Sequence, residues 1–97
     1  MYETLKNNGL PVRLTKGSGN QDHDGDIIVD GKPGLMIECK ERDKKNVVIP
    51  LETIQKAKRE AGMKDWAVAF NNNREGDEFV LIDLWFFMDL IERKYGE

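Results

Sequence analysis

Apolar and polar residues alternate along this chain in short blocks, and the period of each block predicts one element. Residues 51–61 carry apolar side chains at helical spacing and are followed by Gly62, which predicts an amphipathic helix. A second helix is predicted over about 84–95, where apolar residues form a broad band. Short apolar runs bounded by Gly, Asn and Asp predict strands at 12–14, 27–29, 35–40, 66–70 and 78–83, after a short helix at 2–8.

The strands at 27–29 and 35–40 are separated by a turn rich in Gly and Pro, so they are predicted to form an antiparallel hairpin. Taken together, the elements run helix, strands, helix, strands, helix, with no internal repeat and no linker. This order predicts one α/β domain over 1–97, a sandwich with a mixed central sheet flanked by helices.

Candidate chemistry lies in this hairpin. An acidic residue two positions before a lysine occurs four times in the chain, but only Glu38 and Lys40 lie in an apolar strand, where a period of two puts them on one face. The hairpin brings Asp26 back beside Glu38. Two carboxylates and a backbone carbonyl, that of Cys39, suit Mg²⁺, and Lys40 is placed to orient an attacking water.

Three segments together resemble a known family. The runs Gly17-Ser18-Gly19, Asp26-Ile27-Ile28-Val29 and Met36-Ile37-Glu38-Cys39-Lys40 are similar to the core of archaeal-type Holliday-junction resolvases, a branch of the PD-(D/E)xK nucleases. The resemblance covers roughly residues 1–85. It implies a restriction-endonuclease-like sandwich and a Mg²⁺-dependent endonuclease, with Mn²⁺ as a substitute, that cuts branched or four-way DNA in recombination and repair.

The resemblance also implies roles for individual residues. Asp26 and Glu38 would be metal ligands, Lys40 the catalytic lysine, and Ser18 a loop residue near the scissile phosphate. Glu3 is the candidate for the glutamate that the family's first helix places beside the metal. Gly25 stands where the family usually has proline, and the basic residue that commonly neighbours the helix glutamate is Thr4 here.

Other functions stay open at this point. Gln55 resembles a glutamine of related families that include small viral replication-repair nucleases, so a nuclease of that type or a nicking enzyme is an alternative. A DNA-binding module that keeps the fold without catalysis is another. The only histidine, His23, is interpreted as a surface residue.

Charge is distributed unevenly. The net charge is −3, which counts against a nucleic-acid partner. However, residues 40–64 hold eight Lys or Arg against four Asp or Glu, whereas residues 74–97 hold three against seven. A basic middle segment beside acidic flanks fits a carboxylate-rich metal site with one DNA-facing surface.

The remaining features concern location and assembly. There is no basic leader with an apolar core, the longest apolar run spans only 84–88, and Cys39 is the single cysteine. We therefore expect a cytoplasmic protein without membrane association, and the resemblance implies a prokaryotic or viral source. The apolar band at 84–91 is wider than one core face needs, which predicts a homodimer closed by the last helix.

Overall fold

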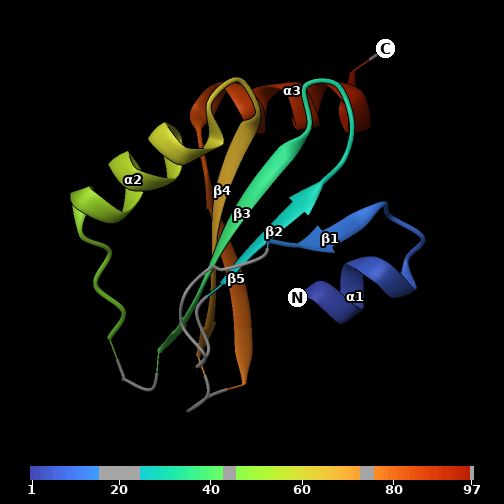
Figure 1. Ribbon diagram of the computed structural model, residues 1–97. Coiled ribbons are helices and arrows are strands. Elements are labelled where there is room, and N and C mark those ends of the chain that lie inside the picture. The colour runs from blue at the N-terminus through green and yellow to red at the C-terminus, as the bar shows by residue number, and fades with distance from the viewer. Residues whose placement is uncertain (16–24, 43–45, 73–75, 97) are drawn as a thin grey trace.

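A computed structural model describes residues 1–15, 25–42, 46–72 and 76–96 of the chain. It is a small α/β structure in which helices flank one five-stranded mixed sheet (Figure 1). Along the chain the elements are α1 (Tyr2–Asn7), β1 (Val12–Leu14), β2 (Gly25–Val29), β3 (Leu35–Arg42), α2 (Leu51–Ala61), β4 (Asp65–Asn72), β5 (Asp77–Ile82) and α3 (Leu84–Tyr95). Every predicted element is present. Half of the strand ends lie one or two residues beyond their predicted positions, and β5 ends one residue earlier than predicted.

The strands follow their sequence order across the sheet, β1-β2-β3-β4-β5. Three neighbouring pairs are antiparallel, including the predicted β2–β3 hairpin, while β3 and β4 are parallel. Parallel neighbours need a crossover, and α2 provides it between β3 and β4. The helix therefore lies against the strand that carries Glu38 and Lys40.

Each face of the sheet has its own hydrophobic cluster. On the α2 face, Ile28 and Met36 pack with Val68, Phe70 and two alanines of the helix. On the opposite face, Ile27 and Ile37 pack with Ala67 and Ala69 below Tyr2 and Leu5 of α1. Strand residues alternate between the two faces, so the even-numbered positions of β2 and β3 face α2.

The α2 helix meets the sheet mainly through its second half. Ala57 and Ala61 are buried, and Gly62 ends the helix with a positive φ of 63°. The helical spacing of apolar residues over 51–61 places Leu51 on the predicted buried side, but it is 66% exposed. The first turn of α2 stands away from the sheet (Figure 1), and the helix comes closest where its side chains are small.

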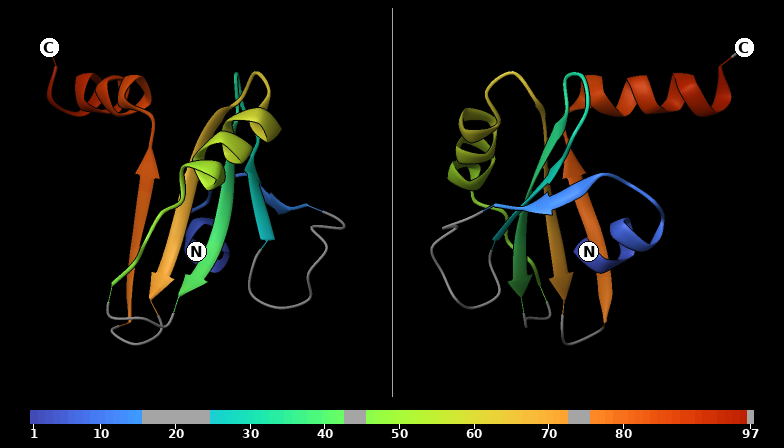
Figure 2. Two further views of the ribbon diagram at one scale, coloured as in Figure 1. Left: turned by 90° about the vertical axis from the view of Figure 1, so that its left-hand side faces the viewer. Right: turned by 45° about the vertical axis from the view of Figure 1, so that its right-hand side comes forward.

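The α3 helix begins directly after the edge strand β5. Asp83 caps it by accepting a hydrogen bond from the backbone N–H of Trp85 at 3.0 Å. Figure 2 shows the helix projecting away from the sheet, and it contains no buried residue. Among the described residues, no helix is long and apolar enough to span a membrane.

Candidate metal centre

The β2–β3 hairpin sets the position of two acidic residues. Its register pairs Asp26 directly with Glu38, as the sequence predicts, and also pairs Ile28 with Met36. Because all four positions are even, the two carboxylates share the α2 face with apolar core residues. Glu38 lies between β2 and β4 in the middle of the sheet, and only 4% of its surface is exposed.

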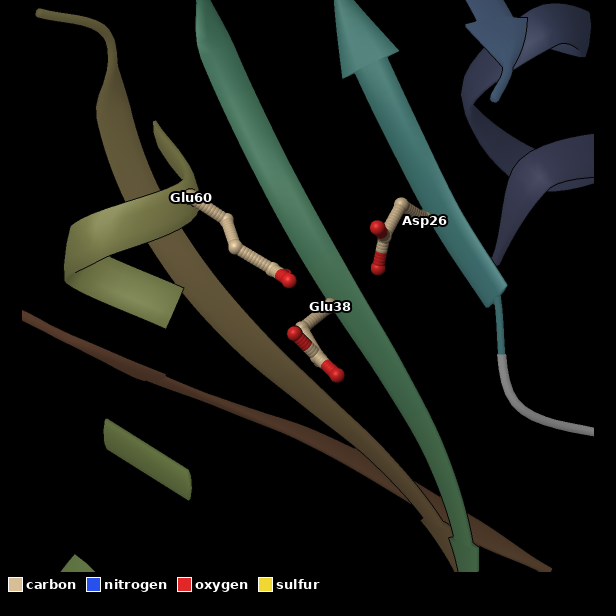
Figure 3. Close-up of side chains that lie close together, drawn as sticks. All are labelled: Asp26, Glu38 and Glu60. Carbon is tan, nitrogen blue, oxygen red and sulfur yellow. The ribbon is translucent and has the colours of Figure 1, made fainter. Parts of the chain in front are cut away.

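A third carboxylate reaches this place from α2. One carboxylate oxygen from each of Asp26, Glu38 and Glu60 can be chosen so that all three lie within 4.8 Å of one another. Figure 3 shows the side chains gathered from β2, β3 and the last turn of α2. We call these three residues the acidic cluster. Its members range from buried Glu38 through half-buried Asp26 to exposed Glu60, so the cluster opens from the sheet toward solvent.

Two ammonium groups approach the same oxygen of Glu38. Lys40 Nζ lies 3.3 Å from Glu38 Oε1, and Lys56 Nζ lies 3.5 Å from it. The other oxygen, Oε2, is buried and has no hydrogen-bond partner in the described part of the chain. Leaving a buried carboxylate oxygen without a partner costs free energy, so this oxygen is suited to accept a cation or a hydrogen-bond donor.

The charges of the cluster alter the protonation of its members. Burial and the nearby charges of Glu38 and Glu60 raise the pKa of Asp26, against the opposing effect of the two lysines. Glu38, then Glu60, raise the pKa of the Lys56 ammonium above its ordinary value of 10.5. Neighbouring negative charge therefore contributes to both shifts, after burial in the case of Asp26, and a bound cation would offset that charge.

The donor set fits a hard divalent cation. Mg²⁺ takes oxygen ligands, commonly one or two carboxylates with water, and Ca²⁺ and Mn²⁺ also accept oxygen donors. The acidic cluster offers carboxylate oxygens alone, and Glu38 Oε2 is not otherwise engaged among the described residues. Since Glu60 is exposed, water can complete the coordination from the solvent side.

Five of the predicted site residues are described by the structure, and four of them lie on the β2–β3 hairpin. Asp26, Glu38 and Lys40 come together on the α2 face, as the strand periodicity predicts. Cys39 lies between Glu38 and Lys40, in register with Gly25 and Ala69, and it packs with the cluster on the opposite face.

Other sequence candidates are not in this group. Glu3 is exposed on α1, the helix that covers the opposite face of the sheet, and it is not among the three carboxylates. Gln55 is exposed on α2. Ser18 and His23 fall outside the described residues.

Sequence reasoning missed Glu60. Lys56 was recognised only as part of a basic helix face that could be a solvated surface or could contact phosphate, and it was not placed beside Glu38. The position of this helix over β3 depends on the crossover. A local signal existed, because Glu60 immediately precedes buried Ala61 and Lys56 precedes buried Ala57. Residues beside the buried stripe of a helix lie at the rim of the contact between helix and sheet.

A pocket at the other end of the sheet is separate from the acidic cluster. It has a volume of about 310 Å³ and includes none of the cluster residues. Its lining consists of Pro33, Lys64, Asp65, Trp66, Asp83, Trp85, Phe86 and Asp89.

Comparisons with models of protein families, with characterised proteins and with solved structures gave no match for this chain.

Proposed function

We propose that this protein is a nuclease that hydrolyses phosphodiester bonds of DNA with a divalent metal ion. The observation that supports this best is the convergence of Asp26, Glu38 and Glu60 beside the ammonium of Lys40. The Glu38 oxygen Oε2 at this place is buried and has no hydrogen-bond partner among the residues that the structure describes. The five-stranded mixed sheet with its helical crossover is compatible with the restriction-endonuclease-like sandwich that the sequence resemblance implies.

Each residue has a role in this proposal. Asp26 and Glu38 hold Mg²⁺ or Mn²⁺, together with the backbone carbonyl of Cys39. Glu60 takes the place that the sequence resemblance gives to Glu3. When bound, the metal ion neutralises charge on the phosphate and lowers the pKa of a bound water. Lys40 donates hydrogen bonds to the attacking water, and its pairing with Glu38 keeps the ammonium at that position.

For the substrate, we propose branched DNA, with the four-way junction as the leading candidate. The sequence resemblance and the basic character of residues 40–64 support this choice. A nicking or replication-repair nuclease would use the same acidic cluster on another DNA shape. A DNA-binding module without catalysis would keep the fold and lack turnover.

Isosteric variants test the proposal. Asp26→Asn, Glu38→Gln and Glu60→Gln each remove one anionic ligand. We expect the first two to lower the rate of cleavage by at least about 100-fold, and Glu60→Gln to lower it less because Glu60 is exposed. Lys40→Met should lower turnover while the protein still binds Mn²⁺ in calorimetry, since an ammonium is not a ligand. Glu3→Gln is the matched control and should cleave at the wild-type rate.

The assay should compare a four-way junction with linear duplex, flap and single-stranded DNA, with Mg²⁺ and with a chelator. Circular dichroism checks that each variant folds. A wild-type protein that binds Mn²⁺ and DNA yet cuts none of these substrates would support the non-catalytic module instead. Asp26→Asn or Glu38→Gln proteins that cleave at near wild-type rates would disprove the assigned site.

A further inference from the structure

Lys56 is a second cation at the acidic cluster that the proposed hydrolysis does not use. Its ammonium lies 3.5 Å from Glu38 Oε1, nearly as close as that of Lys40. The Lys56 side chain has more room to move than that of Lys40, because it is 50% exposed and the Lys40 side chain is 16% exposed. Lys40 rises from the middle of the sheet, whereas Lys56 reaches over from the solvent-facing flank of α2.

Charge balance indicates what Lys56 does. Among the described residues, three carboxylates and two ammonium groups meet here, and they leave one negative charge on the cluster when all are ionised. A divalent cation reverses that sign, which disfavours a lysine held at the same carboxylate, that of Glu38. A phosphodiester then adds one negative charge, which restores neutrality with both lysines present.

We propose that Lys56 is an exchangeable cation of this site. It neutralises Glu38 and Glu60 before metal binds, releases Glu38 when a divalent cation takes the cluster, and then pairs with the phosphate of the DNA substrate. This inference rests on the proposed function and adds a residue that couples metal binding to substrate binding. The long flexible stem of lysine suits the exchange, because its ammonium can move several ångströms without a change in the backbone.

The inference predicts opposite effects of one substitution. Lys56→Met removes a competing positive charge, so Mn²⁺ should bind about 3- to 10-fold more tightly in calorimetry. The same variant should raise the KM for a four-way DNA junction by about 5-fold or more, with a smaller change in kcat, because it loses a phosphate contact. A merely structural role would weaken both kinds of binding or neither.

Two further variants serve as controls. Lys58→Met removes the same charge from an exposed position of α2, so it should leave Mn²⁺ affinity within about 2-fold of wild type. Lys56→Arg keeps the charge and should restore both metal affinity and KM to near wild-type values.

The outcomes separate this inference from the proposed function. If wild-type protein binds Mn²⁺ and cleaves DNA but Lys56→Met binds Mn²⁺ no more tightly, the exchange is disproved and the nuclease assignment stands. Tighter Mn²⁺ binding with an unchanged KM would disprove the phosphate contact. If wild-type protein binds no Mn²⁺, both proposals fail.

Discussion

Glu38 occupies a position where most sheets carry an apolar side chain. Its neighbours on the same face are Met36 and the residues of β4 that form the core under α2. Burying a charge there costs free energy, which the two lysines offset at Oε1 and nothing described offsets at Oε2. The proposed metal ion would offset this cost at Oε2.

Asp26 gives a prediction at the same scale. Its pKa is raised from the ordinary value of 3.8, so between 3.8 and the raised value the folded protein holds more protons than the unfolded chain. In metal-free protein this residue therefore reduces stability as pH rises through that window. Compared with wild type, Asp26→Asn should gain relative stability as pH rises above about 4 and then level off.

Urea unfolding in the presence of a chelator, repeated across pH, measures this difference. Saturating Mg²⁺ should reverse it, because the metal stabilises the ionised wild-type carboxylate and binds the Asn variant poorly. An Asn variant that loses stability relative to wild type over this range without metal would contradict the raised pKa.

At the scale of elements, the hairpin was predictable from sequence and the position of α2 was not. Apolar alternation and a Gly-rich turn are local signals, so they revealed that Asp26 faces Glu38. The position of Glu60 depends on how α2 crosses from β3 to β4 and on the small residues that let it approach the sheet. The position of Glu60 therefore depends on contacts between segments that are distant in the sequence, and the periodicity of apolar residues does not predict such contacts.

The small residues of α2 provide a test of this arrangement. Ala57 is completely buried against the core on the α2 face. Ala57→Leu should overpack that contact, lower the free energy of unfolding by about 1–3 kcal/mol and move the helix outward. Because the Glu60 carboxylate moves away from the cluster with the helix, Mn²⁺ affinity should fall while the variant remains folded.

Lys58→Leu places the same side chain on the exposed face of α2 and should preserve Mn²⁺ affinity. Chemical denaturation measures the stability of the two variants, and calorimetry measures their Mn²⁺ affinity. The comparison distinguishes an effect of moving the helix from an effect of adding a leucine to it. Unchanged metal affinity in a destabilised Ala57→Leu protein would show that α2 does not contribute to the metal site.

At the scale of the whole molecule, α3 exposes a large apolar surface. Trp85 is 76% exposed, and Leu84, Phe87, Met88 and Leu90 are also exposed. Apolar patches of this kind are uncommon on monomeric proteins. We therefore keep the proposal that a second copy of the chain covers α3 across a two-fold axis, which would also give a junction two cutting sites.

Sedimentation at micromolar concentration tests the dimer. Phe87→Asp puts a charge in the middle of the apolar surface and should convert dimer to monomer, because an unpaired buried charge is costly at an interface. Lys94→Asp lies on an exposed position of the same helix and should remain dimeric. A wild-type protein that stays monomeric throughout this range would refute the dimer.

The pairing of Asp26 with Glu38 has a consequence for how this protein responds to selection. Like charges directly opposite each other in neighbouring strands destabilise a sheet, and here they occur within the hairpin that lies between β1 and β4. A laboratory population selected only for heat resistance in a chelating medium should therefore lose one of these two carboxylates early. Lineages that are also selected for the proposed DNA cleavage should retain both carboxylates and acquire their stability elsewhere in the molecule.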